Sequence, residues 1–234
     1  MSAAPDTCPF GLCDGTGFVV DETTRVASAC RCRPARIERH RARSLSAVIP
    51  KKYRNASFDR APVTDMPGPQ VQVVKRFVRE IEDNLDTGRG LWFYGTVGTG
   101  KTTLAMLVSQ AALDAGRSVA IYSLPRLLAE IRATFESDSE GSYVDFLDRL
   151  AAVDLLHVDD VGAERTSDWV LEQLYAIVNA RYETERAMTI TTNIVEQEQL
   201  EEQIGARTVS RLNEMCEVIP IRGQDQRPVL QNSA

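Results

Sequence analysis

The stretch Leu91-Trp-Phe-Tyr-Gly95-Thr-Val-Gly-Thr-Gly-Lys101-Thr102 decides the fold of this 234-residue chain. From Gly95 on it fits the pattern GxxxxGK[ST], in which glycines let the backbone curl so that its N–H groups converge on phosphate oxygens. The four residues before Gly95 are apolar, and Thr102–Ala115 has the character of a helix that stops at Gly116. A strand, a glycine-rich turn and a helix in this order predict a phosphate-binding loop.

Each position of this loop has an expected role. Lys101 should reach the β- and γ-phosphates, and the Thr102 hydroxyl should ligate Mg²⁺. Phosphate contacts are expected along the whole loop and the first turn of the helix, at Gly95, Thr96, Val97, Gly98, Thr99, Gly100, Lys101, Thr102 and Thr103. The alternative is an ordinary glycine-rich turn, and the complete motif between a strand and a helix argues against it.

A second apolar stretch delivers carboxylates to the same edge of the predicted sheet. The expected strand Val153–Val158 is followed by Asp159 and Asp160. Ligands bind at the carboxyl ends of strands in open α/β sheets, so Asp159 should hold Mg²⁺ through water and Asp160 should orient or deprotonate the attacking water. The alternative is a pair of solvated turn aspartates. His157 is expected to be a packed core histidine.

Two further segments complete the predicted site. Asn193, at the end of Thr191-Thr192-Asn193, follows a strand and could sense the γ-phosphate. Arg207 and Arg211 are four residues apart and therefore share a helix face. Such an arginine could stabilise phosphoryl-transfer charge in a neighbouring subunit. Spacing alone favours the alternative, surface salt bridges with nearby glutamates.

The chain from Val71 alternates between helical and extended patterns. The expected helices are Val71–Asn84, Thr102–Ala115, Pro125–Phe135, Tyr143–Ala151, Asp168–Thr184, Gln197–Ile204 and Thr208–Met215, and the expected strands are Leu91–Tyr94, Ser118–Tyr122, Val153–Val158, Ala187–Thr191 and Glu217–Ile221. This alternation predicts an α/β fold, a parallel sheet with helices on both faces. We expect three regions: a cysteine-rich module at residues 1–50, a linker at 51–69 and the α/β domain at 70–234. The short tail after Ile221 predicts that a helical lid is reduced or absent.

Four of the five cysteines lie in the first 32 residues, at Cys8, Cys13, Cys30 and Cys32. In a reducing compartment such a cluster favours metal ligation over disulfides. Four thiolates on two loops match a structural Zn²⁺ site, and a small module with little core needs such a staple. The alternative is free thiols. Cys216 is expected to fill the core.

The overall composition is that of a soluble cytoplasmic protein, with a formal net charge of −6 and 43% hydrophobic residues. We find no signal peptide and no apolar stretch of the roughly 20 residues that span a bilayer, so no membrane association is expected. A basic run begins among the last cysteines and continues toward the α/β domain, at Arg31, Arg33, Arg36, Arg39, Arg41, Arg43, Lys51, Lys52 and Arg54. It suits nucleic-acid phosphates and an acidic protein partner equally well.

Taken together, these blocks resemble the DnaC/DnaI-type loaders of replicative helicases, AAA+ P-loop NTPases. The resemblance rests on the N-terminal cysteines with DGTG, on IPKKYRNASF, GTVGTGKTTL, HVDDVGAE, TITTN, GARTVSRL and IRGQDQRP. It implies ATP and Mg²⁺ as cofactors, a slow ATPase stimulated by partner or DNA, and an N-terminal domain that grips a DnaB-type helicase. It also implies single-stranded DNA as a partner.

The family self-associates through the ATP site, which makes Arg211 the implied arginine finger with Arg207 beside it, against the preference from spacing alone. Arg227 falls where such proteins keep a late arginine.

Two other functions remain open. An IstB-like transposition helper ATPase shares the ATPase blocks, although the cysteine module favours the loader. A nucleotide-gated adaptor with little hydrolysis is the second, because Asp160 stands where a glutamate is usual. A small-molecule P-loop kinase is the weakest alternative, because TTN and SRL would then have no role.

Overall fold

The computed structural model of the chain describes residues 8–21, 23–34, 36–37, 45, 48–136, 142–163, 165–223 and 225. A short antiparallel hairpin, β1 (Phe18–Val20) and β2 (Ala27–Ala29), belongs to the N-terminal region. Two single-turn 3₁₀ helices, η1 (Lys51–Tyr53) and η2 (Val63–Asp65), precede the main domain. Arg39, Arg41, Arg43 and Arg227 lie outside the described residues.

The main domain alternates helices and strands, as the sequence predicts. Its elements are α2 (Gly68–Arg79), α3 (Ile81–Asp86), β3 (Gly90–Tyr94), α4 (Lys101–Asp114), β4 (Val119–Ser123), α5 (Leu124–Glu136), α6 (Ser142–Ala152), β5 (Leu155–Val161), α7 (Asp168–Glu183), β6 (Ala187–Thr192), α8 (Gln197–Ile204), α9 (Ala206–Met215) and β7 (Cys216–Pro220).

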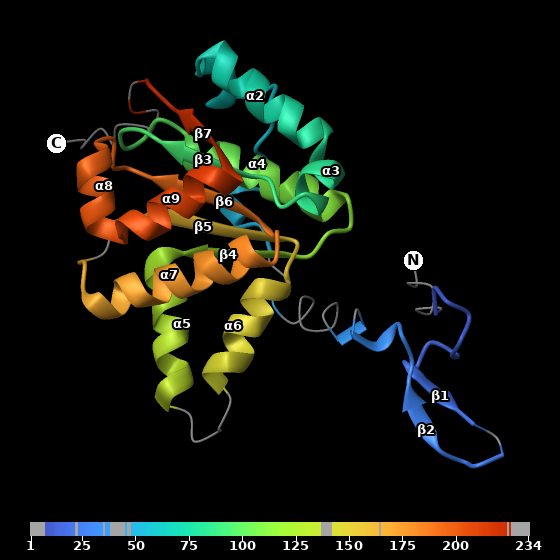
Figure 1. Cartoon of the computed structure of the whole chain (residues 1–234). Helices are drawn as coiled ribbons and strands as arrows, with labels where there is room; N and C mark the ends of the chain where they lie inside the picture. Colours follow the sequence, from blue (N-terminus) through green and yellow to red (C-terminus); the bar gives the residue numbers. More distant parts are fainter. Residues whose placement is uncertain are drawn as a thin grey trace.

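The strands of this domain form one five-stranded sheet in the order β4-β5-β6-β3-β7, and every neighbouring pair is parallel (Figure 1). This confirms the predicted parallel α/β sheet. β3, which leads into the phosphate-binding loop, lies between β6 and β7 inside the sheet.

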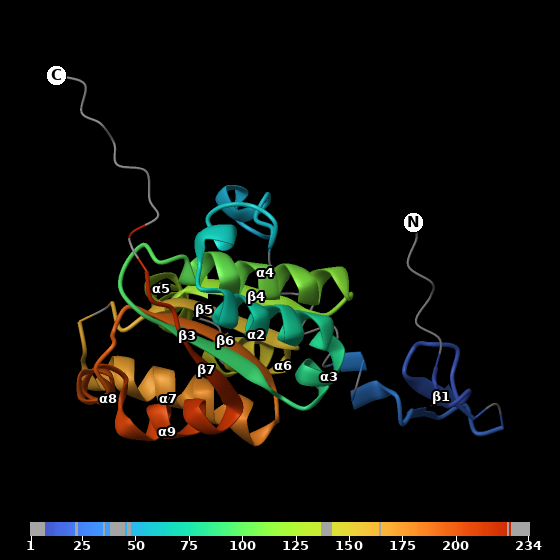
Figure 2. The same cartoon turned by 90° about the horizontal axis from the view of Figure 1, so that it is seen from above.

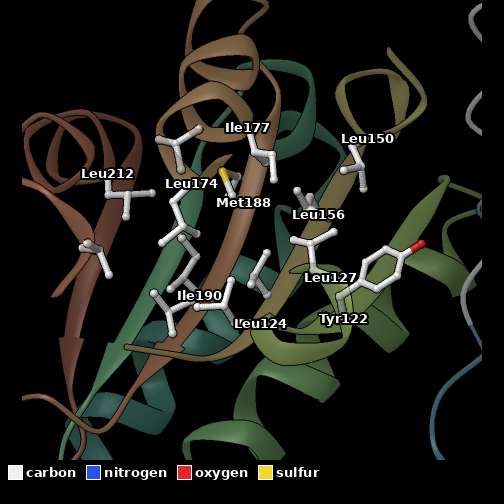
Figure 3. Close-up of a cluster of buried hydrophobic side chains, with 14 of the residues drawn as sticks. Tyr122, Leu124, Leu127, Leu150, Leu156, Leu174, Ile177, Met188, Ile190 and Leu212 are labelled. Atoms are coloured by element: carbon white, nitrogen blue, oxygen red, sulfur yellow. The ribbon is translucent and has the colours of Figure 1, made fainter. Parts of the chain in front are cut away.

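Helices cover both faces of the sheet, and each face has its own core. Alternation along β3 separates the two: Leu91 and Phe93 pack with α2, α3 and α4, whereas Trp92 points to the opposite side. On that side lie α5 to α9 (Figure 2). Figure 3 shows this larger core, with Leu127 of α5, Leu150 of α6, Leu174 of α7 and Leu212 of α9 gathered over Met188 of β6. Both faces of the sheet that carries the site are therefore packed against helices.

Two predicted elements differ most from the structure in their limits. The expected helix Val71–Asn84 is divided at Glu80, whose φ of −103° and ψ of 28° end α2 before α3 begins. The expected strand Val153–Val158 begins at Leu155 and continues to Val161. It continues because residues beyond Val158 still pair with β6. Among the described residues, no helix is long and apolar enough to cross a membrane.

Candidate nucleotide-binding site

The phosphate-binding loop leaves the carboxyl end of β3 and enters α4 at Lys101. Gly100 caps this helix with a left-handed φ of 92°, a conformation that favours glycine. Lys101 is 5% exposed as a residue, and its ammonium donates to the carbonyl oxygens of Gly95 (2.8 Å) and Thr96 (2.7 Å). The lysine therefore lies beneath its own loop, beside the free amides of the helix N-terminus.

The acidic pair sits on an irregular part of β5. Val158 pairs with Ile190 and Val161 with Thr192, so β5 has one more residue than β6 over this stretch. Asp160 lies in this bulge and has a φ of 61°, a value that is uncommon for residues other than glycine. A bulge of this kind redirects side chains at a strand end. The sequence shows two consecutive aspartates but does not show this bulge.

The structure brings four of the predicted residues into one hydrogen-bonded group. The Thr102 hydroxyl donates to Asp159 Oδ1 over 3.0 Å. The Asn193 amide donates to Asp160 Oδ1. Because parallel strands end at a common edge, residues of α4, β5 and the end of β6 meet beside the loop. Asp159 with Thr102 offers oxygen ligands of the kind that Mg²⁺ takes.

Thr191 joins the two halves of this group, and the sequence analysis gave it no role of its own. Its hydroxyl donates to Asp159 Oδ1 over 2.6 Å and accepts from the Asp160 backbone N–H over 2.9 Å. Thr192 makes a parallel contact one residue later, donating to the carbonyl of Val161. The doublet of threonines before Asn193 was the available signal, since both are buried polar residues at a strand end.

Three residues from outside the nucleotide-binding motifs also lie near the loop. Burial, followed by the charge of nearby Asp159, raises the pKa of the half-buried Tyr53 phenol. A Cβ on Gly100 would lie 1.9 Å from the terminal methyl of Met66, and a Cβ on Gly98 would lie 1.8 Å from a carboxylate oxygen of Asp225. The connecting segment and the C-terminal tail therefore both border the phosphate-binding loop.

His157 lies behind the acidic pair and is fully buried, as the sequence predicts. Its Nδ1 is 2.9 Å from the Ser109 hydroxyl of α4, and its Nε2 is 4.0 Å from Asp159 Oδ1. Burial lowers the pKa of this imidazole to about 4, against the opposing influence of the Asp159 carboxylate. The side chain is therefore neutral at physiological pH.

The two candidate finger residues lie on α9. Arg211 stacks on two tyrosines of α7, with its guanidinium carbon 5.4 Å from the ring centre of Tyr175 and 4.7 Å from that of Tyr182. It also donates to the Tyr175 hydroxyl over 3.1 Å. Arg207 is exposed. Arg211 therefore contacts two aromatic side chains, Tyr175 and Tyr182, and not the glutamates that spacing alone favoured.

The four N-terminal cysteines lie together around the β1–β2 hairpin. Their sulfurs are all within 4.8 Å of one another, with Cys8 and Cys30 at 3.7 Å and Cys13 and Cys32 at 3.6 Å. A tetrahedral zinc with Zn–S bonds of about 2.3 Å requires sulfur separations of about 3.8 Å. Burial, followed by contact with the other thiols, raises the pKa of Cys32 to about 12. Four thiolates there therefore need a cation, and the donor set fits Zn²⁺.

Comparison with known proteins agrees with this geometry. The chain is 26% identical over 165 residues to the replicative helicase loader DnaC of Buchnera aphidicola subsp. Schizaphis graminum, covering 70% of this chain and 65% of that protein. It thus spans less than two thirds of the length of this relative. The crystal structure of the DnaC helicase loader superimposes with a TM-score of 0.65 and 28% identity, over 74% of this chain and all of that one.

The replication initiator DnaA, in a structure with AMPPCP and single-stranded DNA, shares the fold at a TM-score of 0.62 and 22% identity, over 77% of this chain and 53% of that one. The main domain is therefore an AAA+ P-loop NTPase fold. A family model described as IstB-like ATP binding protein matches residues 33–234. Since that is most of the sequence, the chain belongs to the family of IstB-like ATP-binding proteins.

Proposed function

We propose that the protein is an ATP-dependent helicase loader, which binds a hexameric DnaB-type helicase and delivers it onto single-stranded DNA. The observation that carries this proposal is the likeness to the DnaC helicase loader, which extends over the whole of that solved chain. A second support is the sheet edge of this chain, at which Thr102, Asp159, Asp160 and Asn193 meet.

The site supports ATP hydrolysis through its own residues. Lys101 would hold the β- and γ-phosphates, and Thr102 with Asp159 would hold Mg²⁺, which neutralises phosphate charge when bound. Asp160 would orient the attacking water, aided by Asn193, which already donates to its carboxylate. Asp160 is shorter than the glutamate that is usual at this position. This difference supports a slow ATPase that a partner or DNA accelerates.

Self-association would complete the site. Arg211 is held on the surface of α9 by its two tyrosines, whose rings keep the guanidinium at a defined place. In a side-by-side assembly this arginine would stabilise the phosphoryl-transfer charge in the neighbouring copy. ATP would then drive loading through its higher affinity for the assembled state.

The cysteine cluster would hold one structural Zn²⁺ through Cys8, Cys13, Cys30 and Cys32. Zinc there would fix two loops on a hairpin that has little apolar core of its own. We assign the helicase contact to this module and the basic run that follows it.

A second function, transposition helper ATPase, is favoured by the family model, whose description is IstB-like. Its match begins at residue 33, after the last of the four clustered cysteines. The four clustered cysteines therefore lie outside the family match, and they are the feature that distinguishes the two functions.

The decisive experiment mixes the full chain with the replicative helicase of the same cell, with and without Mg²⁺-ATP, in size exclusion with light scattering. We expect a complex that the double variant Cys30→Ser, Cys32→Ser loses and the control Cys216→Ala retains. Lys101→Ala should keep the complex but fail to load helicase on single-stranded DNA. Absence of a complex under every nucleotide condition, together with ATPase stimulation by duplex DNA, would favour the transposition helper instead.

A further inference from the structure

Two neighbouring helices, α7 and α9, bring the side chains of Tyr182, Arg211 and Glu214 together. The helices pack side by side on one face of the sheet (Figure 1). Tyr182 is the last residue but one of α7, whereas Arg211 and Glu214 lie three positions apart on α9. The tyrosine therefore contacts both charged side chains from across the boundary between the helices.

Tyr182 uses its ring for one of these partners and its hydroxyl for the other. The guanidinium carbon of Arg211 lies over the ring, 4.7 Å from its centre, where the aromatic face attracts a cation. The hydroxyl donates to Glu214 Oε2 over 2.6 Å, a short hydrogen bond of the kind that an ionised carboxylate accepts. The hydrogen bond to Glu214 and the charge of this carboxylate raise the pKa of the phenol, so the proton stays on the tyrosine at physiological pH.

This arrangement replaces an ion pair that the helix itself would favour. Residues three positions apart on a helix are neighbours, and opposite charges at that spacing attract each other. Nevertheless, within the part of the chain that the structure describes, Arg211 contacts Tyr175 and Tyr182 and not Glu214. The guanidinium has five N–H donors, and its one hydrogen bond here is to the Tyr175 hydroxyl. The cation therefore keeps both its charge and most of its donors for another anion.

We propose that Tyr182 is a positioning residue for the arginine finger, because its hydroxyl occupies the Glu214 carboxylate and so keeps Arg211 available to the nucleotide phosphates of a neighbouring copy. The inference rests on the proposed role of Arg211 in self-association, and it does not depend on helicase delivery. It assigns opposite effects to two side chains: Tyr182 supports the finger, and Glu214 competes for it.

Removal of the hydroxyl alone tests this competition. Tyr182→Phe retains the ring under Arg211 but releases Glu214, which then pairs with the arginine. We expect turnover of ATP to fall about 3- to 5-fold, the size of a surface ion pair. The double variant Tyr182→Phe, Glu214→Gln should recover the wild-type turnover, because the amide has no charge with which to hold the guanidinium. Glu214→Gln alone should match the wild type.

Mixing two chains shows where the hydroxyl acts. One chain carries Lys101→Ala and supplies Arg211, and is here named the finger chain. The other carries Arg211→Ala and supplies the intact loop, and is here named the site chain. Tyr182→Phe in the finger chain should lower the ATPase activity of the mixture about 3- to 5-fold, and the same substitution in the site chain should have no effect. A defect of folding would lower the activity from either chain.

Two further measurements complete the test. Tyr143→Phe is the matched control, because its hydroxyl donates to a neutral partner, Gln173, over 2.6 Å. It should leave the activity of the mixture unchanged in either chain. Affinity of the single variants for a fluorescent ATP analogue should equal that of the wild type, because the arginine acts in the site of another copy.

The outcomes separate this inference from the finger role on which it rests. Full activity with Tyr182→Phe in the finger chain would overturn the inference and leave the finger role standing. Equal losses from both chains, or a loss that Glu214→Gln does not reverse, would assign Tyr182 to the packing of α7 on α9 and also overturn it. If the mixture of Lys101→Ala and Arg211→Ala shows no recovery at all, both the finger role and the inference are wrong.

Discussion

The Thr191 hydroxyl donates to the Asp159 carboxylate over 2.6 Å, and the same oxygen accepts the backbone N–H of Asp160 over 2.9 Å. One buried side chain on β6 thus fixes both the carboxylate and the strained backbone of the bulge beside it. A non-glycine residue at a positive φ persists where its surroundings determine it. Thr191 supplies that constraint, so we treat it as a positioning residue for the acidic pair.

Replacing Thr191 with valine keeps the shape of the side chain but removes both hydrogen bonds. We expect the turnover number for ATP hydrolysis to fall about 10- to 100-fold, as for other groups that orient metal-binding carboxylates. Nucleotide affinity in the absence of Mg²⁺ should stay within about twofold of wild type, because Thr191 does not contact the loop backbone.

Thr189→Val provides the control on the same strand. Thr189 is fully buried, and its hydroxyl has no hydrogen-bond partner among the described residues. Removing an unsatisfied buried hydroxyl should leave activity unchanged and hold or raise the unfolding free energy. Equal activity losses in the two variants would show that strand packing, not the contact with Asp159, explains the effect.

The Asp225 carboxylate lies against Gly98, where phosphate oxygens are expected. Two negative groups at one loop repel each other, so Asp225→Asn should tighten binding of an ATP analogue about 3- to 10-fold. Asp114→Asn makes the same charge change at the far end of α4, about 20 Å from the loop, and should have no effect. Fluorescence titration of both variants measures the difference. A weaker affinity of Asp225→Asn would show instead that the carboxylate assists nucleotide binding.

Much of the fold could be predicted because its signals are local. The apolar run at Leu91–Tyr94, the glycine-rich turn and the following helix each depend on neighbouring residues, and the structure contains all three in this order. The limits of β5 could not be predicted, because Asp159 and Asp160 are polar. Their place in the strand depends on pairing with β6, a contact between residues more than 30 positions apart.

The same distinction applies to the site. Motif spacing indicated Lys101, Thr102, Asp159, Asp160 and Asn193. Tyr53, Met66 and Asp225 were missed because their segments contain no nucleotide-binding pattern, although Tyr53 and Asp225 belong to blocks that carry the family resemblance. Only the folded chain places these residues near the loop. Thr191 belongs to the TTN motif, which the sequence shows. Its two hydrogen bonds, to the Asp159 carboxylate and from the Asp160 N–H, depend on the bulge in β5, and no local sequence signal indicates this bulge.

Arg211 is expected to act in the site of a neighbouring copy. Arg211→Ala should retain nucleotide affinity but lose about 1,000-fold in turnover, the order of an arginine finger. Mixing separates this role from a structural one. Lys101→Ala lacks a working site but retains the arginine, so mixing it with Arg211→Ala should restore ATPase activity above either variant alone. Arg207→Ala serves as the comparison from the same helix. No recovery on mixing would place the function of Arg211 within its own subunit.

The zinc assignment predicts the metal content of the purified protein. The wild type and Cys216→Ala should each contain one zinc per chain by elemental analysis. Cys8→Ser, Cys13→Ser, Cys30→Ser and Cys32→Ser should each fall well below that value, because loss of one thiolate breaks the tetrahedral set. Nucleotide binding should persist in all four, since the five-stranded sheet that carries the loop is separate from the β1–β2 hairpin at the cysteines. Full zinc content in any of these four variants would remove that cysteine from the ligand set.

His157 makes stability depend on pH in a predictable direction. Burial lowers its pKa in the folded state to about 4, whereas an unfolded histidine titrates near the ordinary value of 6.5. Between these values the unfolded chain binds a proton that the folded chain does not, so stability is fully present above about pH 6.5 and declines as pH falls toward 4. At pH 5 we expect this residue to lower the unfolding free energy by on the order of 1–2 kcal/mol relative to pH 7.5.

The histidine contribution is isolated by a difference between proteins, because carboxylates and cysteines also titrate in this range. Urea unfolding of the wild type and of His157→Leu is compared at pH 7.5 and pH 5. Leucine fills the core position without a titrating group. The His157→Leu variant should therefore lose less unfolding free energy between pH 7.5 and pH 5 than the wild type does. Identical losses in the two proteins would mean that the imidazole takes up its proton inside the folded structure, beside the Asp159 carboxylate that lies 4.0 Å from its Nε2.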